Sequence, residues 1–377
     1  NAFNYSTSSL CGIADCGKDV FYRFLSREDY DWRKILINIT TQLWHKTQAS
    51  TERDDKTPVC LMVDDTDYPK RGIQTEMIGK VFSHVEHKMI LGFKGLFLGI
   101  TDGATQMLMD FCLVGEKGKN GTYNLKQKQL DARFVKDRKE DSHTAMRVKE
   151  YDESKITLMI EMIKRLISRK VHFDYILADS WFACAEVIKF VTSRHIKCHY
   201  LGMIKMGKTK YRYNRKDYTA KALVALFDHP KKGRKFCRSL GCYYVTVDVE
   251  FAGRKVRLFF TKRNKKSDWN ALITTNTKLE FKEAYHIYSM RWSLEVVFKD
   301  SKGNLGLGKY QMRNFASQIA CTAITAMQYN ILATARRFSS YETIGGLFRE
   351  VTRNSAELTI TERIWGMIID IINEIAQ

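Results

Sequence analysis

Two apolar runs, each followed directly by an acidic residue, constrain the fold of this chain more than any other feature. Residues 59–63 are all apolar and lead into Asp64, and residues 173–178 are largely apolar and lead into Asp179. Such runs are typical of strands that are buried on both faces of a sheet. Because sheets with flanking helices form their sites at the carboxyl ends of strands, both acids are candidates for one common site.

The remaining periodicity predicts an α/β chain, with a mixed sheet flanked by helices. Further strands are predicted at residues 92–100, 107–113 and 199–204, and helices at residues 155–168 and 183–194. The chain then divides into a helical N-terminal region (1–57), the first part of a core (58–204), a basic β-rich insertion (205–266), the second part of the core (267–312) and a helical C-terminal region (313–377).

Segments beside the predicted core leave alternatives open. Residues 9–26 have the form of a helix, a turn and a second helix, which fits either docking in a DNA groove or a small helical cap. Residues 116–154 are highly charged with few large apolar side chains, so we expect an exposed, mobile excursion. Asp102 and Asp110 are predicted to be turn and strand-surface residues.

The charge of the chain indicates a polyanion as partner. Lys and Arg number 62 against 42 acidic residues, a formal net charge of +20. Residues 205–266 carry 19 Lys and Arg but only 4 acids, a concentration that a merely solubilising surface would not need. We expect this stretch to follow the DNA backbone with cations that are interleaved with tyrosines: Lys208, Lys210, Arg212, Arg215 and Lys216 among Tyr211, Tyr213 and Tyr218.

Cysteine spacing and hydropathy argue against a disulfide framework, a zinc site and a membrane span. The nine cysteines are scattered and include no CxxC pair, which is typical of reduced thiols in the cytoplasm. His84 and His87 have H-x-x-H spacing but no further ligands nearby in the sequence. Residues 317–335 are uncharged, but polar side chains such as Gln318 and Asn330 predict a buried helix there.

A helix predicted at residues 277–303 presents a third acid. Residues 277–280 have the Thr-x-x-Glu form of a capping box, which marks its start. One stripe of roughly 60° holds four polar residues beside the apolar face that would pack on the sheet: Tyr288, Arg291, Glu295 and Lys302. Taken alone, this pattern also fits an ordinary amphipathic helix with an Arg291–Glu295 ion pair. Together with the two strand-end acids, it supplies the oxygen ligands that hard divalent cations need.

The spacing of these four residues resembles a family signature. Tyr288, Arg291, Glu295 and Lys302 match the Y-(2)-R-(3)-E-(6)-K pattern of bacterial DDE transposases of the insertion-sequence-four type, and residues 303–308 resemble the usual continuation. The resemblance covers about residues 58–335. It implies an RNase H-like fold with a β-rich insertion before the glutamate helix, cut-and-paste transposition, terminal inverted repeats and target DNA as substrates, a homodimeric synaptic complex, and Mg²⁺ as cofactor, with Mn²⁺ as a substitute.

The expected mechanism assigns a role to each residue of the predicted site. Asp64, Asp179 and Glu295 would ligate two Mg²⁺ about 4 Å apart, and Asp65 or Asp67 remains an alternative to Asp64 as the first ligand. Arg291 and Lys302 would bind phosphate oxygens, and Tyr288 would hydrogen-bond to the DNA backbone. Two aromatic candidates remain, Trp292 and Trp181. Each would either stack on an unpaired base at the cleaved end or belong to the core.

Two other functions fit parts of the same pattern. An RNase H-like nuclease such as a junction resolvase would use similar acids but would cut branched DNA without joining ends. A non-catalytic DNA-binding protein derived from a transposase would be expected to have lost an acid, whereas all three candidates are present here.

Overall fold

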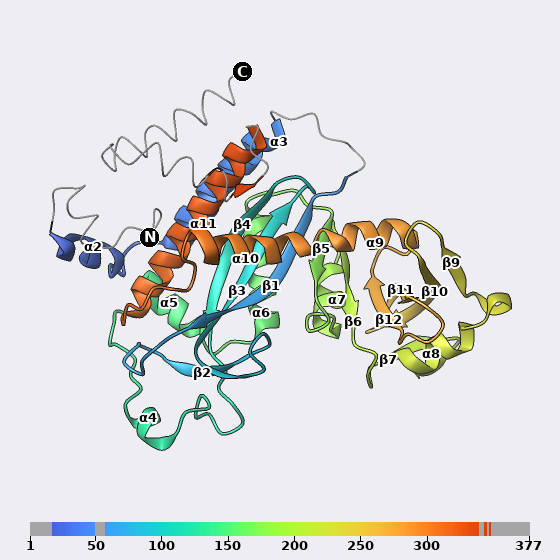
Figure 1. Cartoon of the computed structure of the whole chain (residues 1–377), viewed down its shortest axis with the longest axis horizontal. Coiled ribbons are helices and arrows are strands. Elements are labelled where there is room, and N and C mark those ends of the chain that lie inside the picture. The colour runs from blue at the N-terminus through green and yellow to red at the C-terminus, as the bar shows by residue number, and fades with distance from the viewer. Residues whose placement is uncertain (1–16, 50–56, 339–342, 345–346, 348–377) are drawn as a thin grey trace.

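The computed structural model describes residues 17–49, 57–338, 343, 344 and 347, and the elements they form are shown in Figure 1. The first half of the helix pair predicted at residues 9–26, residues 9–16, therefore lies outside the described residues, and the second half contains α2 (Lys18–Leu25). The part of the predicted C-terminal region after residue 347 also lies outside them. Among the described residues, no helix combines the length and apolar composition that a membrane span requires.

The core of the molecule is a mixed sheet. Strand β1 (Cys60–Pro69) pairs antiparallel with β3 (Lys88–Thr101), which pairs with β4 (Gln106–Val114) and, at its start, with β2 (Gly79–Ser83). On its other side, β1 pairs in parallel with β5 (Tyr175–Ala178), and β5 pairs in parallel with β6 (His199–Ile204). An antiparallel meander of three strands followed by two parallel strands is the RNase H-like arrangement, so this expectation is confirmed.

Helices cover both faces of this sheet, which explains why the first apolar run is uninterrupted. Cys60 and Met62 join the core beneath α10 (Trp292–Asn304) and α11 (Phe315–Phe338). Leu61 and Val63 join the other core, beneath α6 (Lys155–Ser168) and α7 (Ala185–Val191). Successive side chains of a strand point to opposite faces, so a strand that is covered on both sides has no polar position.

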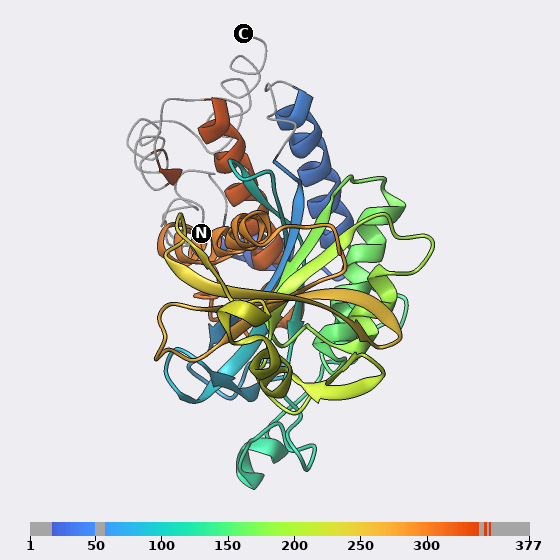
Figure 2. The ribbon, with the colours of Figure 1, turned by 90° about the vertical axis from the view of Figure 1, so that its right-hand side faces the viewer.

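The sheet continues from the core into the basic segment. Strand β12 (Asn270–Thr274) pairs antiparallel with β6 and with β11 (Arg254–Lys262), which pairs with β10 (Cys242–Phe251). Figure 2 shows these strands crossing in front of the core strands, so the sheet twists strongly along its length. The other elements of the segment lie around them: β7 (Lys210–Tyr213), β8 (Lys216–Thr219), α8 (Ala220–Phe227), the 3-10 turn η1 (Pro230–Lys232) and β9 (Lys235–Cys237).

Three predicted element boundaries are wrong. Strand β1 does not end at Asp64 but runs on to Pro69, because its antiparallel pairing with β3 continues after its parallel pairing with β5 stops. The predicted capping box is not formed, since the helix starts after Glu280. The long helix is also divided, into α9 (Phe281–Ser289) and α10, by hydrogen bonds of i to i−3 type around Arg291.

The charged segment 116–154 is not simply an exposed excursion. It contains α4 (Gln127–Asp131) and α5 (His143–Glu150), and Leu125 and Tyr151 are buried. Helix α5 contacts β4, so the second half of the segment covers the edge of the sheet.

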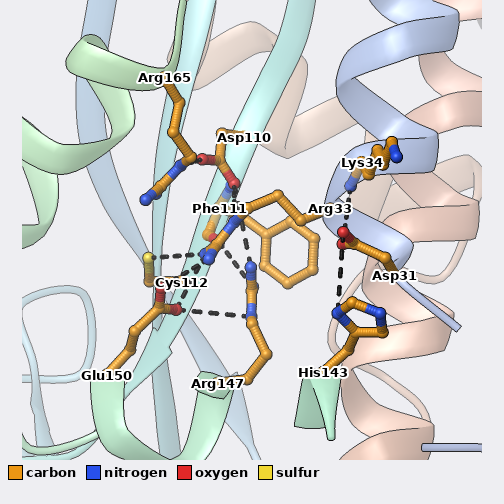
Figure 3. Close-up of polar contacts among 10 residues, drawn as sticks. All are labelled: Asp31, Arg33, Lys34, Asp110, Phe111, Cys112, His143, Arg147, Glu150 and Arg165. Carbon is orange, nitrogen blue, oxygen red and sulfur yellow. Dashed lines mark hydrogen bonds and ion pairs between the residues drawn. The ribbon is translucent and has the colours of Figure 1, made fainter. Parts of the chain in front are cut away.

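Asp110 is fully buried, which corrects the prediction that it lies on the strand surface (Figure 3). Arg33, from α3 (Trp32–Ala49), and Arg165, from α6, each donate to one of its carboxylate oxygens, over 2.9 and 2.8 Å. Arg33 also pairs with Glu150, and Arg33 and Arg147 both donate to the carbonyl of Phe111. Burial acts to raise the pKa of Asp110, but the surrounding arginines hold it below its ordinary value. The cluster therefore ties α3, α5 and α6 to strand β4.

Candidate active site

Asp64 and Asp179 lie next to each other on adjacent strands. The last paired residues of the parallel ladder are Val63 in β1 and Ala178 in β5, and the two acids come directly after them. Neighbouring strands are about 5 Å apart, so the two carboxyl groups start from neighbouring positions at the same end of the ladder. After Asp179 the chain turns away, and the Asp179 side chain accepts a hydrogen bond of 2.9 Å from the backbone N–H of Trp181.

Burial dominates the electrostatics of Asp64. Burial, opposed by Arg291 and helped by the negative charges of Asp65 and Asp179, raises the pKa of Asp64 to about 6. One Asp64 oxygen also accepts the backbone N–H of Asp65 over 2.8 Å. Two neighbouring carboxylates that are shielded from water repel each other, so a cation that contacts both of them stabilises their ionised forms.

Glu295 reaches the same region from the helix side. It lies one turn into α10, whose Leu294, Val297 and Phe298 are buried and fix which face of the helix meets the sheet. The Glu295 side chain remains 34% exposed, at the border of the core. The break at Arg291 does not separate it from Glu295, because the two residues are four apart across the start of α10.

Arg291 links Glu295 to Asp64. One terminal nitrogen of its guanidinium donates to Asp64 over 2.6 Å and the other donates to Glu295 over 2.7 Å. Within the described ranges, no three His, Cys, Asp or Glu side chains are already close enough to share a metal ion. The donor set of Asp64, Asp179 and Glu295 nevertheless has the chemistry of a hard-cation site, since all three offer carboxylate oxygens. A metal ion would need the position that the guanidinium takes between Asp64 and Glu295.

Tyr288 lies beside Arg291, at the end of α9. Its hydroxyl is buried and has no hydrogen-bond partner in the described part of the chain. The ring of Tyr288 forms part of the wall of a pocket of about 570 Å³, together with Met203, Arg263 and Tyr285.

Lys302 belongs to a second charged group, separate from Arg291. Lys94 is buried and pairs with both Asp65 and Asp67, and Lys155 also pairs with Asp65. Burial lowers the pKa of Lys302, and the nearby charge of Asp67 opposes this shift. Sequence reasoning missed Lys94 and Lys155, because nothing in their local patterns indicates that strand β3 and helix α6 bring them to β1.

Both candidate tryptophans are on the surface, so the interpretation that they belong to the core is wrong. Trp181 is 60% exposed and Trp292 is 63% exposed. The ammonium groups of Lys205 and Lys155 lie 5.2 and 5.9 Å from the ring of Trp181, which combines an aromatic face with two cations near Asp179.

The basic segment presents its predicted cations to solvent. Lys208, Lys210, Arg212 and Arg215 are exposed, although Arg212 pairs with Asp217 over 3.1 Å. Tyr211 differs from the expectation, since it is buried against Phe251. The surface of this segment is therefore charged but carries fewer free aromatic rings than its sequence indicates.

Comparisons with known proteins place the chain in a family. Two family models match, described as DDE superfamily endonuclease (residues 8–220) and transposase DDE domain (residues 141–331). No curated protein matches the chain. Among solved structures, it is similar to a piggyBac transposase synaptic complex with hairpin DNA (10% identity, 84% of this chain and 57% of that one, TM-score 0.40) and to the NurA nuclease from Sulfolobus solfataricus (10% identity, 72% and 84%, TM-score 0.28).

The chain thus spans less than two thirds of the piggyBac transposase chain. Each of the two family models, in contrast, matches more than half of the 377 residues. The chain therefore belongs to the DDE superfamily of endonucleases and transposases.

Proposed function

We propose that the chain is a cut-and-paste DNA transposase of the insertion-sequence-four type, which binds terminal inverted repeats and catalyses strand cleavage and strand transfer. One observation carries this proposal: Asp64 and Asp179 end the same parallel ladder, and Arg291 joins Asp64 to Glu295. These contacts support a site in which Asp64, Asp179 and Glu295 come from distant parts of the sequence to one region of the core.

The three acids form the metal site of this proposal, with Mg²⁺ as the natural ion and Mn²⁺ as a substitute. When bound, two such ions supply activation of the attacking water or 3′-hydroxyl and stabilisation of the leaving 3′-oxygen. The alternation of β1 favours Asp64 over its neighbours as first ligand, since Asp64 lies on the face of Met62, towards α10. Asp65 and Asp67 are already paired with lysines.

The surrounding residues hold the DNA in the proposed enzyme. Arg291 and Lys302 bind phosphate oxygens, and the free Tyr288 hydroxyl donates to the backbone near the cleaved bond. The exposed rings of Trp181 and Trp292 meet bases at the opened end. The basic surface around Lys208 and Arg215 tracks the duplex farther from the site.

The proposed assembly is a homodimer that holds two transposon ends and then target DNA. This assembly follows from the resemblance to the insertion-sequence-four family, which rests on the spacing of Tyr288, Arg291, Glu295 and Lys302. The same resemblance implies a bacterial cytoplasmic location, on the nucleoid when DNA is bound. Inverted repeats flanking the coding region, with short direct repeats outside them, would supply the DNA ends for an assay.

The proposal is tested by incubating labelled end DNA with Mg²⁺ and comparing wild type with Glu295→Gln. Wild type should nick the end and join it to target DNA, and Glu295→Gln should do neither. Glu283→Gln is the matched control, because Glu283 is exposed on the neighbouring helix α9. Equal cleavage by wild type and Glu295→Gln would refute the assignment of Glu295. Cutting of branched DNA without joining would favour a resolvase, and end binding without cutting would favour a non-catalytic protein.

A further inference from the structure

Arg291 makes two ion pairs in the place that the proposed metal ions need. Its two terminal nitrogens lie 2.6 Å from Oδ2 of Asp64 and 2.7 Å from Oε1 of Glu295. All three side chains are at least partly buried, with 15, 20 and 34% of their surface exposed for Arg291, Asp64 and Glu295. Ion pairs with this degree of burial are screened less by solvent than pairs on an open surface.

The same oxygens cannot serve the guanidinium and a metal ion at once. The other oxygen of Asp64, Oδ1, already accepts the backbone N–H of Asp65, and Arg291 holds Oδ2, the oxygen that faces Glu295 through the guanidinium. A divalent ion between Asp64 and Glu295 would therefore have to displace a positive group from both carboxylates. Displacement costs the two charge-assisted hydrogen bonds and brings like charges together.

DNA offers Arg291 another partner. The planar fork of a guanidinium binds phosphate oxygens in the same two-pronged way as it binds carboxylates. A phosphate near the site would compete for Arg291 and release Oδ2 of Asp64 and Oε1 of Glu295. Metal and DNA binding would then favour each other, and thermodynamic linkage makes that coupling reciprocal.

We infer that Arg291 occupies the cation position between Asp64 and Glu295 in the DNA-free protein, so that divalent metal ions load only when DNA phosphate draws Arg291 away. This inference rests on the proposed function, because it assumes that these carboxylates are the metal ligands. In the proposed function Arg291 only binds phosphate. The inference gives Arg291 a second role, which sets the order of assembly: DNA binds first and the metal ions bind second.

Binding of Mn²⁺ to the DNA-free protein tests this inference without any measurement of cleavage. Free Mn²⁺ is followed by electron paramagnetic resonance during titration of wild type, Arg291→Gln and Lys302→Gln. We expect Arg291→Gln to bind Mn²⁺ about tenfold more tightly than wild type, the scale of a lost charge-assisted hydrogen bond. Lys302→Gln is the matched control, since it removes the same charge from α10, which begins directly after Arg291, but breaks no ion pair with Asp64 or Glu295.

Further variants separate failure of the inference from failure of the proposed function. Arg291→Lys keeps the charge but cannot bridge both acids, so it should also bind Mn²⁺ more tightly than wild type even if Arg291→Gln folds poorly. Asp179→Asn added to Arg291→Gln should abolish the gain. If Arg291→Gln binds no more tightly than wild type, or Lys302→Gln gains as much, the inference is overturned while the metal site can stand. If Asp179→Asn leaves Mn²⁺ binding unchanged both in the wild-type protein and in Arg291→Gln, the proposed metal site fails and the inference fails with it.

Discussion

Asp64 and Asp179, 115 positions apart in the sequence, are neighbours because each follows the last pair of the β1–β5 ladder, Val63 and Ala178. The burial of Asp64, together with the nearby charge of Asp179, raises the pKa of Asp64 to about 6. The fold therefore holds a carboxylate where its ionised form is unfavourable, which is a common cost of a site that must bind cations.

The first prediction is that Asp64→Asn stabilises the metal-free protein at neutral pH. The folded pKa of about 6 is above the ordinary value of 3.8, so the folded state binds the extra proton and stability is lost as pH rises between these values. Removing the charge should raise the free energy of unfolding by about 2 kcal/mol at pH 7.5. Chemical denaturation in EDTA measures this, and the gain should vanish near pH 4. Asp137→Asn, at an exposed position, should change little, and a destabilised Asp64→Asn would contradict the prediction.

The second prediction concerns the buried Asp110. Asp110→Asn should lower the free energy of unfolding by about 3 kcal/mol, because Arg33 and Arg165 would keep their partly buried charges without a carboxylate between them. Since the pKa of Asp110 is held below its ordinary value, its contribution is present above that value and is lost as pH falls through the folded pKa. Wild type and variant should therefore converge in acid.

Glu161→Gln is the control for Asp110→Asn. It breaks an exposed ion pair with Lys164 and should cost less than about 1 kcal/mol. An Asp110→Asn protein as stable as Glu161→Gln would show that the arginine cluster does not depend on this carboxylate.

The third prediction separates stability from activity at Tyr288. Its hydroxyl is buried without a partner in the described ranges, so Tyr288→Phe should leave the thermal stability unchanged or raise it slightly. If the hydroxyl donates to DNA, cleavage of end DNA should nevertheless fall by roughly tenfold. Tyr175→Phe is the contrasting variant, because the Tyr175 hydroxyl accepts a 2.8 Å hydrogen bond from Asn276, and its loss should lower the melting temperature. Unaltered cleavage by Tyr288→Phe would remove Tyr288 from the DNA contacts.

The fourth prediction is that the exposed cations of the basic segment bind phosphate. Lys208→Gln and Arg215→Gln should each weaken binding of any duplex and reduce the slope of log affinity against log salt by about one. Fluorescence anisotropy over a range of salt concentrations measures both. Lys164→Gln removes a charge from α6 and should leave the slope as it is, so an equal change in all three variants would argue against a defined DNA path.

The sequence predicts the core of this fold well, because burial of the strands and of one face of each helix determines where apolar residues recur along the chain. Helix α6 and strand β6 have the predicted bounds, 155–168 and 199–204, and the apolar run at 59–63 lies in two cores at once. Alternation along β1 also explains why adjacent acids have different partners, Arg291 for Asp64 and Lys155 for Asp65.

Features that depend on contacts between distant segments could not be predicted in this way. Burial of Asp110 requires arginines from α3, α5 and α6, none of which has a signal in the sequence around β4. The division of the glutamate helix at Arg291 is equally hidden, since residues on both sides of it favour helix and continue the same apolar face.

The pairing of β6 with both β5 and β12 has a mechanical consequence. Backbone hydrogen bonds run without interruption from β5, which ends just before Asp179, to the strands of the basic segment, so we expect the two parts to move together. A duplex held at the far end of that sheet would meet the carboxylates at a fixed span. We therefore expect the position of the cut to lie at a constant distance from the phosphates that the basic segment contacts.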